Sequence, residues 1–166
     1  MKNEPSRLFK ELWGKYQKSI YRYFRREFSE EIAEDLSQQT YLKLWEHIET
    51  LNGKNIFQQR VWLFTVARNV RNDYLRYKLR HQQNFIWQEL LESDRVVEPD
   101  LEESLLIHKA MDELSKEDRE LLNMVQYLTS AEIGEVLGIS ASAVRSRTQK
   151  SKQHLFENLK KYDVEI

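Results

Sequence analysis

Polar side chains suited to hydrogen bonding with DNA bases cluster between residues 142 and 150. Arginine donates two hydrogen bonds to the major-groove edge of guanine, and glutamine pairs in the same way with adenine. Such side chains on the outward face of one helix therefore predict recognition of duplex DNA. Five polar or basic residues point outward from a predicted final helix: Ser142, Arg145, Ser146, Gln149 and Lys150.

The segment that leads into these residues fits the steric pattern of a helix-turn-helix. Gly134 is small where two helices are predicted to cross, and Gly138 suits a tight turn that a side chain would strain. Apolar residues occupy the predicted contacts between the helices: Ile133, Leu137, Ile139 and Val144. The second helix of this motif enters the major groove. The alternative is a plain helical hairpin with a basic surface, but six matching positions favour the motif.

A second group of chemically distinctive residues is spaced three, three and four apart. Asp35, Gln38, Tyr41 and Trp45 place an acid, an amide and two aromatic rings on one helix face. A face that mixes apolar bulk with polar groups suits a protein partner. The alternative is that the two aromatic residues belong to the core, with Asp35 favoured by the helix dipole. Spacing alone favours this alternative.

The charge of the chain is small in total but strongly segregated. The 166 residues include 26 Lys and Arg against 27 Asp and Glu, a formal net charge of −1, which at face value argues against a nucleic-acid partner. Residues 1–80 nevertheless carry 16 basic and 10 acidic side chains, and residues 81–117 carry 3 and 10. Basic side chains are concentrated in 60–80 and 141–161. Such segments are typical of polyanion binding, although they also solvate helix faces.

Several classes of function lack the residues they need. There is no Cys, which excludes a disulfide framework, a thiolate metal site and a cysteine nucleophile. The four His residues are scattered and match no metal-ligand spacing, and no Gly-rich phosphate loop occurs among the four Gly. No apolar run reaches the roughly 20 residues that span a bilayer. We therefore expect a cytoplasmic protein without a membrane-inserted segment, cofactor, metal or catalytic site.

The pattern of apolar residues predicts an all-α chain. Apolar residues recur at helical spacing through most of the sequence, and strand signals are missing. Capping signals mark the helix starts, including Ser29, Ser115, a capping box from Thr129 to Glu132, and Ser140. Helices are predicted at about 6–28, from Ser29 to a turn at Asn52-Gly53, at about 57–81, at about 101–113, after Ser115, after Thr129, and at about 141–160.

An acidic stretch divides the chain. We expect two small helical domains, residues 1–83 and 104–166, joined by a linker over 84–103. The linker contains Pro99 and seven acidic residues, and residues 85–91 suit a short anchored helix.

Four segments, in this order, resemble the extracytoplasmic-function (ECF) sigma factors of bacterial RNA polymerase, which belong to the sigma-70 family. Residues 33–45 are similar to region 2.1–2.2, residues 61–76 to region 2.3–2.4, residues 114–122 to the start of region 4, and residues 130–152 to region 4.2. The chain departs from the usual pattern at Ser115, where the family commonly has Pro. The resemblance implies a transcription initiation factor that binds core polymerase and directs it to promoters.

The resemblance also implies roles for the first domain. The face of Asp35, Gln38, Tyr41 and Trp45 would bind the coiled coil of the β′ clamp, which reverses the interpretation from spacing alone. The loop over 50–58, with Asn55, would capture a flipped −10 base. Phe57 and Trp62 are candidates for stacking on unpaired bases, and the alternative is that both belong to the core. The residues implied to hold the melted strand are Arg68, Asn69, Arg71, Asn72, Tyr74 and Arg76.

In the second domain, the resemblance implies that the final helix reads the −35 element. Arg145, Ser146, Gln149 and Lys150 would read the element, and Arg147 and Lys152 would contact phosphates. Ser142 is a further candidate for binding the −35 DNA. The acidic linker would pass through the RNA channel of the polymerase. The implied partners are core polymerase, through its β′ clamp and β flap, promoter DNA, and an anti-sigma factor. The anti-sigma factor would bind the protein while it is not bound to polymerase and could hold it at the membrane.

Three alternatives to this interpretation remain at the level of sequence. A helix-turn-helix repressor or activator would bind palindromic DNA without polymerase. An enzyme lacks a supporting constellation of residues. An all-helical protein adaptor would leave the basic final helix without a purpose.

Overall fold

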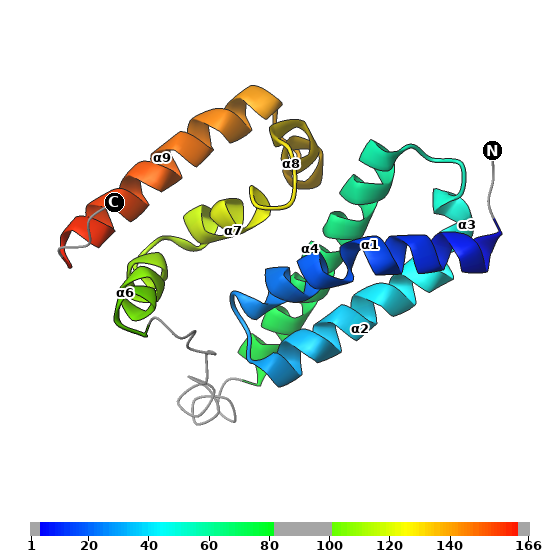
Figure 1. The fold of residues 1–166 in the computed structure, drawn as a ribbon, viewed down its shortest axis with the longest axis horizontal. Coiled ribbons are helices and arrows are strands. Elements are labelled where there is room, and N and C mark those ends of the chain that lie inside the picture. Colours follow the sequence, from blue (N-terminus) through cyan, green and yellow to red (C-terminus); the bar gives the residue numbers. More distant parts are fainter. Residues whose placement is uncertain (1–3, 82–100, 163–166) are drawn as a thin grey trace. The chain divides into compact units, whose positions relative to one another are not determined.

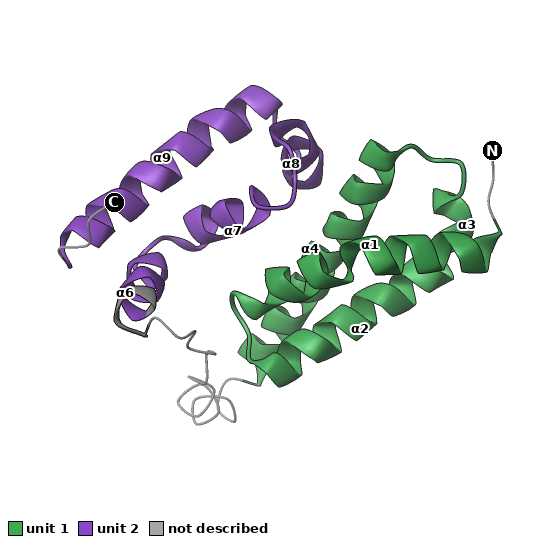
Figure 2. Cartoon of the chain, viewed as in Figure 1, with its two compact units in different colours: residues 1–95 green, residues 96–166 purple. Residues whose placement is uncertain are grey.

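The computed structural model describes residues 4–81 and 101–162, with side chains from 105 onward in the second range. The chain divides into two compact units, residues 1–95 and 96–166 (Figure 2). Every regular element in the described ranges is a helix, as predicted (Figure 1). Residues 84–100 of the predicted linker, and the short helix predicted within them at 85–91, lie outside the described residues.

The first unit begins with two long helices. Helix α1 (Pro5–Arg25) starts with Pro at the position where a missing N–H costs nothing. Its apolar residues recur every four positions and are buried: Leu8, Leu12, Tyr16, Ile20 and Phe24. Helix α2 (Glu30–Glu46) is capped by Ser29, whose Oγ accepts a hydrogen bond from the Ile32 amide. The predicted cap at Ser29 is thus confirmed.

Two further helices complete this unit. The sequence predicts one helix from Ser29 to the turn at Asn52-Gly53, but α2 ends before His47 and a separate short helix, α3 (Ile48–Leu51), follows. Gly53 adopts a φ of 87°, which a side chain would disfavour. Helix α4 (Ile56–Arg80) then starts at a capping box formed by Asn55 and Gln58.

The core of the first unit forms where α2 packs against both α1 and α4. Aromatic rings meet edge to face within it, with the Tyr23 and Phe64 ring centroids 6.1 Å apart. Edge-to-face rings contribute about 0.5–1.5 kcal/mol beyond the burial of their area. The remaining fully buried apolar side chains on α2 and α4 include Leu36, Leu44, Leu63 and Ala67.

The second unit consists of α6 (Leu101–Asp112), α7 (Lys116–Met124), α8 (Ser130–Leu137) and α9 (Ala141–Lys160). Each predicted cap is confirmed. The Asp118 amide donates to Ser115 Oγ, the Ala143 amide to Ser140 Oγ, and Thr129 and Glu132 form the reciprocal capping box. The long helix α9 packs against α6, α7 and α8.

Candidate nucleic-acid and protein interfaces

The close crossing of α8 and α9 depends on two glycines. A Cβ on Gly134 would lie 2.6 Å from the carbonyl oxygen of Ile139, so a larger residue would push the helices apart. The Ile139 amide donates a 3.0 Å hydrogen bond to the Gly134 carbonyl across this turn. Gly138 has a φ of 73° in the left-handed region, where glycine avoids strain. The local geometry is therefore that of the predicted helix-turn-helix.

The outer face of α9 carries the predicted DNA-reading residues. Val144 and Ser151 face inward and are buried, which turns the opposite face to solvent. The basic side chains on this face form no ion pair with any side chain that the structure describes. They are thus available to an anionic partner. All seven predicted −35 residues are exposed: Ser142, Arg145, Ser146, Arg147, Gln149, Lys150 and Lys152.

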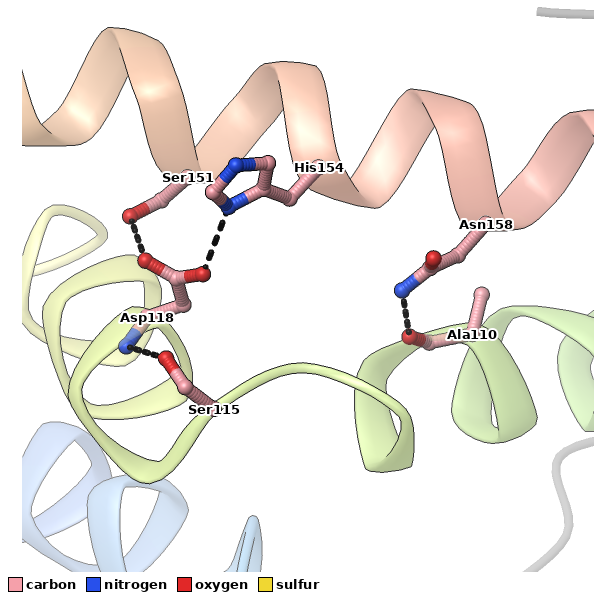
Figure 3. A network of polar contacts seen from close by, with 6 residues as sticks. All are labelled: Ala110, Ser115, Asp118, Ser151, His154 and Asn158. Atoms are coloured by element: carbon pink, nitrogen blue, oxygen red, sulfur yellow. Dashed lines mark hydrogen bonds and ion pairs between the residues drawn. The ribbon is translucent and has the colours of Figure 1, made fainter.

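A carboxylate on α7 holds the middle of α9 in place (Figure 3). Ser151 Oγ donates a 2.6 Å hydrogen bond to one oxygen of Asp118, and His154 Nδ1 lies 2.9 Å from the other. Burial raises the pKa of Asp118, but the bonds from Ser151 and His154, the His154 charge and the bond to Ser115 together outweigh burial and lower it. Because these bonds come from one helix turn, they fix α9 against rotation.

The end of α9 is tied to α6. Asn158 Nδ2 donates a 3.1 Å hydrogen bond to the Ala110 carbonyl, as Figure 3 shows. Just beyond the helix, the Tyr162 hydroxyl donates to Glu113, and this bond raises the pKa of Tyr162. The sequence reasoning missed these positioning residues because nothing in their local spacing marks them.

The predicted −10 residues of α4 separate into exposed and buried groups. Asn69 and Arg76 are exposed, and Arg76 pairs loosely with Asp73, with an N–O distance of 3.1 Å between two exposed side chains. Tyr74 is half-buried against Phe28, with ring centroids 5.3 Å apart. Arg68 and Asn72 are also half-buried.

Arg71 does not belong to the exposed group. Its Nε and Nη2 donate hydrogen bonds of 2.7 and 2.9 Å to the two carboxylate oxygens of Glu27, and its Nη1 donates to Asn72 Oδ1. Only 9% of the Arg71 side chain is exposed. The structure therefore removes Arg71 from the predicted DNA-contacting surface and makes it a link between α4 and the end of α1. Burial of a helix face was the competing signal that the sequence reasoning did not weigh.

The start of α4 presents exposed apolar side chains. Ile56 is 59% exposed and Phe57 is 40% exposed. Asn55 is predicted to help capture a base. Its Oδ1 accepts a 2.8 Å hydrogen bond from the Gln58 amide, so this oxygen caps the start of α4. Trp62 is half-buried beside His47. Phe57 is therefore the more exposed of the two predicted stacking candidates.

The predicted protein-binding face of α2 is only partly exposed. Asp35 and Gln38 are exposed, and Trp45 is 49% exposed with its ring edge-on to Phe9 at 5.3 Å. Tyr41 instead lies buried beneath Trp13, with ring centroids 3.6 Å apart, and burial raises its pKa far above the usual value. The core interpretation of Tyr41 is therefore the one that the structure supports.

The sequence reasoning missed one residue of this face. Leu42 is 62% exposed, although leucine is usually inside, and it follows Gln38 by one helical turn. A large exposed apolar side chain between Gln38 and Trp45 gives the face an apolar centre. Four residues now define what we call the α2 face: Asp35, Gln38, Leu42 and Trp45.

Two absences hold for the described ranges. Residues 4–81 and 101–162 contain no group of His, Asp and Glu side chains that could hold a metal ion. Within the same ranges, no helix combines the length and the apolar character that crossing a membrane requires.

Comparison with known families agrees with this geometry. The family profile described as Sigma-70 region 2 matches residues 12–81, and the profile described as Sigma-70, region 4 matches residues 104–155. The chain is 31% identical over 147 residues to the ECF RNA polymerase sigma factor SigL of Mycobacterium tuberculosis (strain ATCC 25618 / H37Rv), covering 84% of this chain and 82% of SigL.

Two solved structures share the fold. The sigma factor RpoE from Bartonella quintana, solved in complex with the anti-sigma factor NepR, aligns with a TM-score of 0.70 and 22% identity over 92% of this chain and 96% of RpoE. CnrH, solved in complex with the cytosolic domain of CnrY, aligns with a TM-score of 0.69 and 20% identity over 96% of this chain and 91% of CnrH.

Proposed function

Because the chain belongs to the sigma-70 family, as an ECF sigma factor and thus a transcription initiation factor, we propose how its two units divide the work of promoter recognition. The single observation that carries the proposal is the exposed, unpaired basic face of α9 on a sterically complete helix-turn-helix. Region 4, which contains α9, binds the −35 element as duplex DNA. Region 2, which contains α2 and α4, binds core polymerase and the melted −10 strand.

On α9, Arg145 and Gln149 are the residues best suited to bases. They lie four positions apart and share one exposed side of the helix. Arginine and glutamine are the side chains that discriminate guanine and adenine in the major groove. Ser142, Ser146 and Lys150 assist in base contact, and Arg147 and Lys152 neutralise phosphates.

On α4, the −10 strand is held by the residues that stay accessible. Phe57 stacks on an unpaired base near Asn55, which contributes about 1–3 kcal/mol for each stacked base. Arg71 acts indirectly, because its ion pair with Glu27 keeps α4 in register with α1. The residues that contact the strand are Arg68, Asn69, Asn72, Tyr74 and Arg76.

The α2 face binds the clamp of core polymerase. Its apolar centre, Leu42 and Trp45, is flanked by the polar Asp35 and Gln38, as in a protein interface with a polar rim. Tyr41 supports this face from beneath, against Trp13. The β flap of the polymerase binds region 4.

An anti-sigma factor is the partner expected outside the polymerase. The RpoE and CnrH structures were both solved in complexes, the former with a named anti-sigma factor. The α2 face here is an exposed apolar surface, which a partner would cover while the protein is not bound to polymerase. Association with the membrane would come through that partner.

The substitution Arg145→Ala tests the role of α9. In transcription reactions with core polymerase on a promoter mapped by start-site sequencing, we expect a loss of about tenfold, because one base pair contact is removed. Binding to core polymerase in a pull-down should stay at the wild-type level. Lys160→Ala, in the last turn of the same helix, is the matched control. Loss of core binding by Arg145→Ala, or unchanged transcription, would refute the assignment.

A further inference from the structure

The solvent face of α1 carries a row of basic residues that the functions above do not use. Lys10, Gly14, Lys18 and Arg22 follow one another at intervals of four and are all exposed. They lie opposite the buried apolar row of the same helix, which has the same spacing and is offset by two residues. We call these four residues the α1 row.

Helix α1 is predominantly basic. Helix α1 contains six basic residues and a single acidic one, Glu11, which pairs with Arg7 at 3.6 Å on the surface. Lys10, Lys18 and Arg22 form no ion pair with any side chain in the described part of the chain. Unneutralised positive charge over residues 10–22, about three and a half helical turns, is suited to a polyanion.

Gly14 is an anomaly within the row. Glycine is the poorest helix former after proline, and Gly14 stands in the middle of a helix of 21 residues. A Cβ added there would meet no atom within 4 Å, so packing inside the protein does not require glycine. A glycine on an exposed face permits close approach of another molecule to the helix backbone. We call the space left by the missing side chain of Gly14 the notch. Lys10 and Lys18 lie one helical turn before and after it.

The residues that follow α1 contact the part of α4 that faces DNA in the proposed function. Just after the end of α1, Glu27 forms the ion pair with Arg71, and Phe28 packs edge-on against Tyr74. Asn72, which follows Arg71 on α4, and Tyr74 are two of the proposed contacts with the −10 strand. The segment that directly follows the row, Glu27 and Phe28, therefore contacts the helix that carries the proposed −10 surface.

We infer that the α1 row is a second DNA-binding surface of region 2, on which a phosphate backbone lies close to Gly14 between Lys10 and Lys18. The inference rests on the proposed function, because it extends the DNA path from α4 onto α1. The contact is with phosphates and carries no sequence information of its own. Its role is to strengthen and position promoter binding.

Gly14→Ala separates this role from stability. Because alanine is the best helix former and the site is open, the melting temperature of the full chain should rise by about 3 °C. Binding to DNA should fall by about fivefold, because a methyl group would occupy the notch. A residue with a purely structural role would not show opposite changes in these two quantities.

The double variant Lys10→Gln/Lys18→Gln tests the charge. The full chain is titrated with labelled mixed-sequence DNA, single-stranded in one arm and duplex in the other, over about 50–200 mM salt. The slope of log affinity against log salt should decrease by about 1.4 for the single strand or about 1.8 for the duplex, whichever form occupies the row. Lys109→Gln/Lys116→Gln, which removes two exposed lysines on α6 and α7, should leave the slope unchanged.

Two results would overturn the inference. One is DNA binding by both α1 variants that equals that of the wild type in both arms. The other is unchanged DNA binding with weakened binding to core polymerase, which would assign the row to an acidic protein surface. Failure of the wild-type chain to support transcription with core polymerase would instead refute the proposed function, so the two failures are distinguishable.

Discussion

Burial decides which residues of a recognised motif remain available for binding. On α2, Tyr41 and Leu42 are neighbours in sequence, yet Tyr41 is buried under Trp13 and Leu42 is largely exposed. On α4, Arg71 is buried while Arg76 is exposed. Residue type alone does not predict which of these side chains is buried. Tyrosine and arginine occur both in protein interiors and on surfaces, and an exposed leucine is not unusual.

Leu42→Ala should weaken binding to core polymerase by about tenfold, since burying a leucine side chain in an interface contributes about 1.5–3 kcal/mol. The free energy of unfolding should stay close to the wild-type value. Leu79→Ala is the matched control, because Leu79 is 64% exposed and lies near the end of α4 and not on α2. Competition against another sigma factor measures the affinity. Equal loss in both variants would contradict the assignment.

Arg71→Ala should lower the free energy of unfolding by about 3 kcal/mol, because it leaves Glu27 without its largely buried partner. Arg76→Ala removes an exposed pair and should cost less than about 0.5 kcal/mol. Urea unfolding of both variants measures the difference. Similar stability of the two variants would show that the Arg71 pair does not hold α4 in place.

At the scale of the elements, local signals predicted the helix starts well. Ser29, Ser115, Thr129 and Ser140 each act as caps in the structure, because side chains that bond to the first amides of a helix act over only three residues. The break at His47 was missed, since the apolar spacing runs through it to Ile48. The contacts of Asp118 with Ser151 and His154 join residues more than 30 positions apart, which no local pattern reveals.

The docking of α9 on α7 should depend on pH through Asp118. Its pKa is lower in the folded protein than its ordinary value of 3.8, so the unfolded chain takes up the proton first as pH falls. The stabilising contribution is therefore present above about pH 3.8 and is lost as pH falls through the lower folded pKa.

Asp118→Asn should lower the melting temperature most above about pH 3.8, and its difference from the wild type should shrink below that pH. Thermal unfolding followed by circular dichroism across this range measures the difference. Glu135→Gln removes an exposed carboxylate on α8 and serves as the control. A difference for Asp118→Asn that stays constant with pH would show that the network does not contribute through ionised Asp118.

At the scale of the whole molecule, a net charge of −1 is compatible with a DNA-binding protein because the charges are separated along the chain. The basic residues on α1, α4 and α9 belong to two units, and in the proposed function each unit binds DNA through a limited surface. Two modest surfaces bind tightly only when both engage one DNA molecule together. We therefore expect core polymerase, by holding both units on one promoter, to convert weak binding into specific binding.

The dependence of promoter binding on core polymerase tests this account most directly. A labelled promoter fragment, chosen by start-site mapping, is titrated with the full chain in the presence and absence of core enzyme at physiological salt. The account predicts a specific complex and transcription from the mapped start only when both proteins are present. Tight binding of the chain alone to a palindromic fragment, without any gain from core enzyme, would contradict it and identify a repressor or activator instead.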